Sequence, residues 1–164
     1  MAGDDDLRAL YDASYRRLVV QLYALGGDLA VAEDVVQEAF VTALRKRRDL
    51  ASVEHPEAWI RAIAVNLLRK GWRHAAVVRK YQAAVPGPQG SPEIGPEHVA
   101  LVQALAQLDH DQRMVVVLHH LADHGTAEIA IELGIPEGTV KSRLARGRSR
   151  LADLLRDQEE SRHG

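Results

Sequence analysis

The 164-residue sequence contains no cysteine and a single phenylalanine, and aromatic residues make up only 4% of it. Without cysteine the chain has no disulfide, no zinc–thiolate site and no thiol redox switch of its own. With so few aromatics, a core depends on Leu, Val, Ile and Ala, which favours packed helices over sheets. No apolar run approaches the roughly 20 residues of a membrane span. The N-terminus is acidic, unlike a signal peptide, so we expect a cytoplasmic protein without membrane insertion.

The charges are unevenly distributed, although the formal net charge is only −2. Positions 61–80 hold six basic and no acidic residues, and positions 136–156 hold six basic and two acidic ones. The intervening positions 81–135 hold seven acidic residues and one arginine. Two basic stretches separated by an acidic one predict two contact surfaces for nucleic acid. Solvated helix faces would explain either basic stretch taken alone.

Apolar residues recur at helical spacing, and they predict an all-α fold of two small helical domains joined by a flexible linker. Helices are expected at about 6–25, 29–48, 56 to beyond 72, 97–108, 111–121, 126–133 and 137–155. Between Val85 and Pro96 lie four prolines and three glycines, which cannot continue a helix. The expected organisation is a first domain at 1–82, a linker at 83–96, a second domain at 97–156 and a frayed tail at 157–164.

The segment that begins at Thr126 has the spacing of a helix-turn-helix. Ala130 is the small residue expected where the helices touch, Gly134 tolerates the positive φ of the turn, and Val140 is the apolar anchor. We expect Gly125 to cap the first helix. The second helix would present to a major groove the polar residues of its first turns: Glu137, Thr139, Lys141, Ser142, Arg143 and Arg146. A helical hairpin that binds only protein would leave this basic face unexplained.

Four segments resemble the extracytoplasmic-function (ECF) sigma factors of bacterial RNA polymerase, in the family's order. Ile135–Leu151 (Ile-Pro-Glu-Gly-Thr-Val-Lys-Ser-Arg-Leu-Ala-Arg-Gly-Arg-Ser-Arg-Leu) resembles the end of region 4, and Leu108–Leu118 its opening. Ala32–Phe40 (Ala-Glu-Asp-Val-Val-Gln-Glu-Ala-Phe) is similar to region 2.2, and Pro56–Arg69 to regions 2.3 and 2.4. The resemblance spans essentially the whole expected fold. It implies region 2 in the first domain and region 4 in the second.

The resemblance also implies a role for each domain. Region 2.2 docks on a coiled coil of the polymerase β′ subunit, and the matching positions are Asp34, Gln37 and Glu38; stabilisation of the helix dipole would explain the same acidic charges. The −10 element falls to Asn66 and the loop 51–55, which would hold a flipped base of the non-template strand. The phosphates of that strand would be bound by Arg61, Arg69, Lys70 and Arg73, with Trp72 stacking on a base.

The implied function is that of an alternative sigma factor, which directs promoter-specific initiation. Its partners would be core RNA polymerase, promoter DNA and an anti-sigma factor. The polymerase would be contacted through the β′ coiled coil and the β flap. The second helix of the helix-turn-helix would read the −35 element of the DNA. The alternative is a helix-turn-helix regulator that does not join the polymerase, but its sensor domain would not need the acidic motif followed by a basic, Asn-bearing helix. We expect no enzyme and no cofactor, because no phosphate-binding loop or nucleophile elbow is present. His119, His120 and His124 lack a zinc signature, so we expect no metal.

Overall fold

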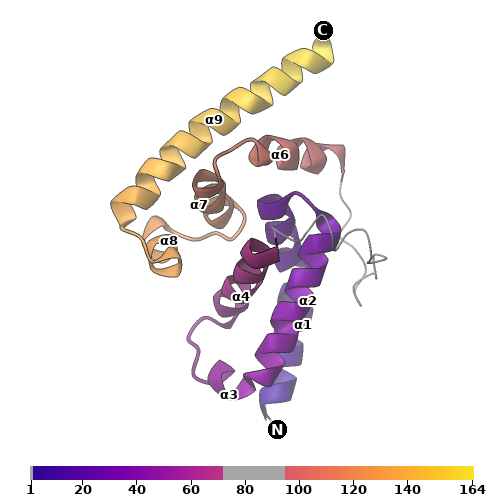
Figure 1. The fold of residues 1–164 in the computed structure, drawn as a ribbon, viewed down its shortest axis with the longest axis vertical. Coiled ribbons are helices and arrows are strands. Elements are labelled where there is room, and N and C mark those ends of the chain that lie inside the picture. Colours follow the sequence, from indigo (N-terminus) through magenta and orange to yellow (C-terminus); the bar gives the residue numbers. More distant parts are fainter. Residues whose placement is uncertain (1, 72–94) are drawn as a thin grey trace. The chain divides into compact units, whose positions relative to one another are not determined.

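The computed structural model describes residues 2–71 and 95–164, all of them in helices and the turns that join them (Figure 1). The chain divides into two compact units, Met1–Pro92 and Glu93–Gly164. The predicted fold class, all-α with two small helical domains, is confirmed. Trp72, Arg73 and most of the expected linker lie outside the described residues. Within the described ranges, no helix combines the length and apolar character needed to cross a membrane.

The first unit is built from α1 (Ala2–Gly26), α2 (Leu29–Arg45), α3 (Arg47–Leu50) and α4 (Pro56–Gly71), with α2 packed against both α1 and α4. Its core consists of apolar side chains from these three long helices, among them Leu18, Leu22, Val36, Ile60 and Leu68, each at most 2% exposed. The first helix ends at Gly26, and the next residue, Gly27, has a φ of +79°, in the left-handed region that favours glycine. Asp28 then caps α2, because its carboxylate accepts a hydrogen bond from the Val31 amide at 3.0 Å.

The second helix is shorter than its sequence pattern predicts. It ends at Arg45, and Lys46, with φ −104° and ψ 28°, leaves the helical conformation before the short helix α3 begins. Leu50 explains this turn, because its side chain is only 8% exposed and anchors α3 in the unit. The prediction of one helix to position 48 and a loop from 49 is therefore wrong, and the connecting segment begins after Leu50.

The second unit consists of α6 (Pro96–Ala106), α7 (His110–His120), α8 (Thr126–Leu133) and α9 (Glu137–His163). Its core includes Leu105, Val115, Leu118, Ile129 and Val140, which are at most 2% exposed. The Arg113 side chain satisfies the carbonyl groups at the end of α6, because its guanidinium donates to the oxygens of Leu105 at 2.8 Å, Leu108 at 3.1 Å and Ala106 at 3.2 Å. Burial lowers the pKa of Arg113.

Helix α9 packs across α7 at Gly147. A Cβ at this buried glycine would lie 2.7 Å from Cγ2 of Val116, closer than any real contact of that kind. The small residue is thus required by the close approach of two helix backbones.

The expected frayed tail at 157–164 is helical, which corrects the prediction. Helix α9 continues to His163, and its far end packs against α6. Leu154 is 6% exposed, and the Gln158 amide donates to the carbonyl oxygen of Ala100 at 3.3 Å. These contacts, together with a run free of Gly and Pro up to Gly164, extend the helix beyond the expected domain boundary at 156.

Candidate nucleic-acid interface

The helix-turn-helix in α8 and α9 has the predicted geometry. Gly125 is the N-cap of α8, and Gly134 ends that helix in the left-handed conformation with φ 67° and ψ 36°. The Ile135 amide donates to the Ala130 carbonyl at 3.1 Å, closing the turn. Val140 is fully buried, so the anchor also lies where the spacing predicts. These contacts hold α9 against α8 across a short turn, as in a DNA-reading pair of helices.

A hydrogen bond joins the first residues of the two helices. The Thr126 hydroxyl donates to the Glu137 carboxylate at 2.8 Å, and Lys141 lies 3.7 Å from the same oxygen, Oε1 of Glu137. Glu137 therefore braces the turn and orients Lys141, whereas the sequence suggested only a DNA contact for it.

Helix α9 keeps most of its polar residues at the surface. Lys141, Ser142 and Arg146 are exposed, and Thr139 is half-buried. Arg143 is also half-buried and lies 3.6 Å from the Asp111 carboxylate of α7. The first turns of α9 thus present exposed Arg146, Lys141 beside Glu137, and Arg143 held in place by α7, a pattern suited to phosphates and base edges.

The histidines beside this helix form structural contacts. Arg148 donates to Nε2 of His120 at 3.0 Å, and the pKa of His120 is lowered by burial, by Arg148 and by His119. The neutral ring can accept this hydrogen bond. The two ring nitrogens of His124 lie 2.8 Å from Glu128 and 3.3 Å from Glu132. Among the described residues, no group of three or more His, Cys, Asp or Glu side chains is arranged to hold a metal ion.

In the first unit, α2 presents an acidic face. Asp34 and Glu38 are exposed, whereas Glu33 is only 6% exposed. The pKa of Asp34 is raised by partial burial and by the neighbouring carboxylates of Glu33 and Asp28. The Gln37 amide donates to the Tyr15 hydroxyl at 3.2 Å, so this side chain is fixed against α1.

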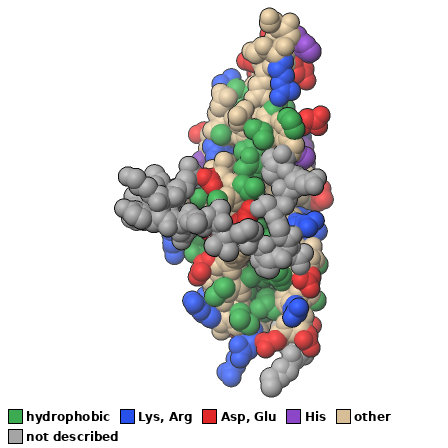
Figure 2. Space-filling view, turned by 90° about the vertical axis from the view of Figure 1, so that its right-hand side faces the viewer, with side chains coloured by type: hydrophobic (Ala, Val, Ile, Leu, Met, Phe, Trp, Pro, Cys, Tyr) green, Lys and Arg blue, Asp and Glu red, His purple; other side chains and the backbone are tan. Residues whose placement is uncertain are grey.

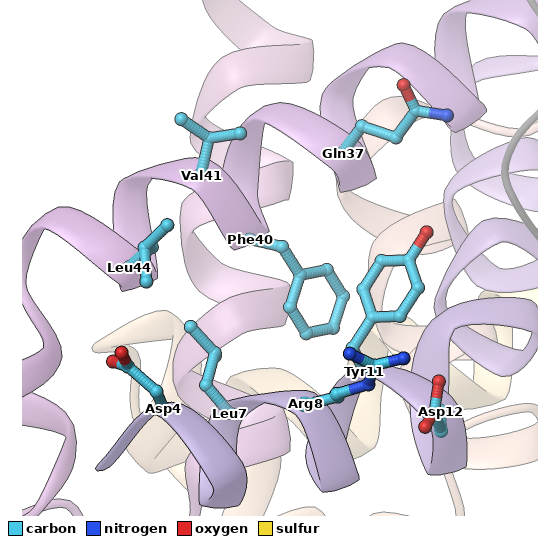
Figure 3. Close-up of a pocket in the computed structure, with 9 residues that line it drawn as sticks. All are labelled: Asp4, Leu7, Arg8, Tyr11, Asp12, Gln37, Phe40, Val41 and Leu44. Carbon is cyan, nitrogen blue, oxygen red and sulfur yellow. The ribbon is translucent and has the colours of Figure 1, made fainter. Parts of the chain in front are cut away.

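An apolar groove of about 670 Å³ runs between α1 and α2, next to Gln37. Figure 3 shows Leu7 and Tyr11 of α1 facing Phe40 and Leu44 of α2 across it. Tyr11 and Phe40 meet edge to face at 4.9 Å, and the groove's upper rim carries Val41 and Leu44, which are 42% and 44% exposed. Such exposed apolar residues beside an acidic face are typical of a protein-binding surface. The groove was not predicted from the sequence, although the spacing of Val41 and Leu44, three residues apart on one helix, was a signal for it.

Of the predicted −10 residues on α4, some are exposed and one is buried. Asn66, Arg69 and Lys70 are exposed, and the segment 51–55 that precedes the helix is largely exposed. Trp72 and Arg73, predicted to belong to the same surface, lie outside the described residues.

Arg61 is the exception, because its side chain is only 2% exposed. Its Nε donates to the Gln21 side chain at 2.8 Å, and its Nη2 lies 3.4 Å from the Glu57 carboxylate, which also pairs with Arg17. The prediction that Arg61 binds a phosphate is corrected by this burial. Arg61 joins α4 to α1 in the interior, and Val65 and Leu68, four and seven residues later, were the signal that it shares the apolar face.

Comparison with known proteins gives the same two units. Residues 10–77 match the family described as Sigma-70 region 2, and residues 98–151 match Sigma-70, region 4. The ECF RNA polymerase sigma factor SigL of Mycobacterium tuberculosis is 35% identical over 145 residues, which cover 84% of this chain and 82% of SigL. The chain belongs to the ECF RNA polymerase sigma factors. SigW of Bacillus subtilis, from the same family, is 30% identical over 94% of this chain and 92% of its own length.

A solved structure extends the likeness to the fold. The sigma factor RpoE of Bartonella quintana, in complex with the anti-sigma factor NepR, is 25% identical with a TM-score of 0.70, covering 92% of this sigma factor and 97% of RpoE. The chain is thus an alternative sigma factor that directs transcription initiation. A helix-turn-helix regulator that stays apart from the polymerase is not favoured.

Proposed function

We propose that this sigma factor, without catalytic chemistry of its own, joins core RNA polymerase in the cytoplasm through α2 and the groove beside it. The acidic pair Asp34 and Glu38 suits a basic partner, and Gln37, next to Glu38 in the sequence, lines the groove together with Val41 and Leu44. A helix with apolar residues on one face and basic residues at its edge fits this combination. The coiled coil of the β′ subunit is the partner that the family resemblance implies.

We propose that the −10 element is read by the exposed surface of α4 and the segment 51–55. Asn66 can offer both a donor and an acceptor to a base extruded from the non-template strand. Arg69 and Lys70, one turn further along, are free to bind the adjacent phosphates. Trp72 remains a proposed stacking residue and Arg73 a proposed phosphate contact, both on the basis of sequence alone. Arg61 supports this surface from inside without contacting DNA.

The −35 element is assigned to the first turns of α9. Lys141, Ser142 and Arg146 form its exposed edge, while Arg143 is directed by Asp111 and Glu137 by Thr126. Contact between the second unit and the β flap would set the distance between α9 and the residues that read the −10 element. The domain boundaries at 82 and 97 are part of the same proposal.

An anti-sigma factor is the proposed inhibitor. The support is that RpoE of Bartonella quintana, which is similar to this chain, was solved in complex with the anti-sigma factor NepR. The groove between α1 and α2 offers such an inhibitor the surface that the polymerase would use.

The observation that carries the proposal is one chain that holds both an acidic, apolar docking face and a helix-turn-helix with a basic reading helix. Run-off transcription with core polymerase, on sheared genomic DNA from the source organism, tests it. The sigma factor is expected to give transcripts from discrete start sites, and Asp34→Lys with Glu38→Lys is expected to abolish them and to lower affinity for core polymerase at least tenfold.

The matched control carries Glu159→Lys with Glu160→Lys, which makes the same charge change at exposed positions of α9. It is expected to transcribe as the wild type does. Specific binding of the protein alone to duplex DNA, with no binding to core polymerase, would refute the proposal.

A further inference from the structure

Four consecutive basic residues, Arg45, Lys46, Arg47 and Arg48, lie where α2 ends and α3 begins, and all four are exposed. We name this run the Arg45–Arg48 ridge. Arg47 lies 3.7 Å from Asp4, with both side chains more than half exposed, so the pair is weak. Arg45, Lys46 and Arg48 make no ion pair with any residue in the described parts of the chain. In Figure 2, Lys and Arg side chains project at the lower end of the first unit, the end at which Figure 1 draws α3.

The backbone of the ridge is well ordered by hydrogen bonds. The Lys46 amide donates to the Thr42 carbonyl at 3.0 Å, and the Lys46 carbonyl accepts from the amides of Asp49 at 2.9 Å and Leu50 at 3.2 Å. Leu50 is buried and holds α3 on the unit. The four charges are therefore carried by a fixed backbone, which reduces the entropy lost when they bind a ligand.

Local stability does not explain the run. A cation in the last turn of a helix is favoured by the helix dipole, and this applies to Arg45. Arg47 and Arg48 lie in α3, a single turn of four residues, where the first and last turns coincide and the helix dipole gives them no clear stabilisation. Four adjacent like charges also repel one another, and a polyanion would relieve that repulsion.

The middle and the C-terminal end of α2 carry opposite charge. Glu38 and Arg45 are seven residues apart, about 10 Å along the helix. A basic partner that binds Asp34 and Glu38 would be repelled by the ridge, so the two parts of the helix suit different partners. The charge of the ridge suits an anion.

The position of the ridge indicates which anion. Helix α3 ends at Leu50, immediately before the segment 51–55. The Ser52 hydroxyl donates to the Asp49 carbonyl at 2.8 Å, so the segment leaves α3 through a closed turn. We propose that the Arg45–Arg48 ridge binds phosphates of the non-template DNA strand as that strand enters the 51–55 segment. This inference rests on the proposed function, in which that segment takes part in reading the −10 element.

The test measures how salt affects binding of the holoenzyme to a single-stranded non-template oligonucleotide, built on a start site mapped by run-off transcription. Each phosphate contact to a single strand contributes about 0.7 to the slope of log affinity against log salt concentration. Arg45→Ala with Arg48→Ala is expected to reduce the slope by about 1.4, the value for two lost contacts. Affinity for core polymerase is expected to match the wild type.

Arg156→Ala with Arg162→Ala is the control, because it removes two exposed cations from α9 in the second unit. Its slope is expected to equal that of the wild type. If the wild type initiates and the ridge variant keeps the full slope, the ridge inference alone is overturned. A loss of core affinity at unchanged slope would overturn it in favour of a polymerase contact. If the wild type neither joins core polymerase nor initiates, the proposed function fails, and the ridge inference fails with it.

Discussion

Replacing Gln21 with leucine is expected to destabilise the first unit by about 2–4 kcal/mol. Gln21 and Arg61 are each 1% exposed, and the Gln21 oxygen accepts from Nε of Arg61 at 2.8 Å. Leucine fills a similar volume but leaves a buried, charged N–H without this acceptor. A hydrogen bond to a charged group contributes about 1.5–3 kcal/mol, and disruption of a buried charged network costs up to about 5 kcal/mol. The greater apolar burial of leucine offsets part of this loss.

Both tryptophans, Trp59 and Trp72, belong to the first unit, so tryptophan fluorescence follows the unfolding of that unit in the full chain. One kcal/mol corresponds to about 4–8 °C in a domain of 60–100 residues, and the midpoint should fall by at least about 8 °C. Arg17→Ala is the control, because Arg17 makes only an exposed pair with Glu57 and its loss should cost less than about 1 kcal/mol.

A second substitution separates the buried charge from a general packing defect. Arg61→Met, added to Gln21→Leu, removes the unsatisfied charge and is expected to recover part of the lost stability, because apolar residues can replace buried ionic groups at little cost. Equal midpoints for Gln21→Leu and Arg17→Ala, or a double variant less stable than Gln21→Leu alone, would refute the reasoning.

Two further predictions concern the second unit, and thermal unfolding by circular dichroism tests both. Gly147→Ala is expected to destabilise the second unit by about 1 kcal/mol, because the clash with Val116 outweighs the helix propensity of alanine. Gly138→Ala is the control and should not destabilise the unit, because no atom lies within 4 Å of its added Cβ. Equal stability of the two variants would contradict the packing argument. Arg113→Ala should lower the stability of the second unit by about 2–3 kcal/mol, because the carbonyl oxygens of Leu105, Ala106 and Leu108 lose its donors. Arg113→Lys should recover little of this stability, since one ammonium cannot reach all three oxygens. Full recovery by lysine would contradict this role of the guanidinium.

The sequence predicted the helix-turn-helix well because its requirements are local. A positive φ at Gly134, a close approach at Ala130 and an anchor at Val140 each depend on spacing within a few turns of the chain, and the structure confirms the left-handed turn and the buried anchor. The order of the helices was predictable for the same reason, since apolar periodicity reports burial of one helix face.

Arg61 shows where charge counting fails. A stretch with six basic residues and no acidic ones was treated as one surface, but a helix distributes its residues around an axis, and Arg61 points inward. Its partner Gln21 is 40 positions away, so no local pattern could reveal the pair. The polarity of the tail predicts fraying, but Leu154 and Gln158, four residues apart, share the face that meets α6. The Arg45–Arg48 ridge was overlooked because the turn at Lys46, which leaves these side chains at the surface, depends on the burial of Leu50.

In α9, the residues that pack in the core differ from those that would contact DNA, and this bears on how promoter preference can change. The residues that hold the helix in the unit, Val140, Leu144 and Gly147, are buried, while Lys141, Ser142 and Arg146 are exposed and support nothing in the core. Under the proposed −35 role of α9, substitutions on the exposed edge are therefore expected to change DNA preference with little effect on folding. Arg143 is coupled to Asp111, so a new preference that depends on this position requires two changes, one in each helix.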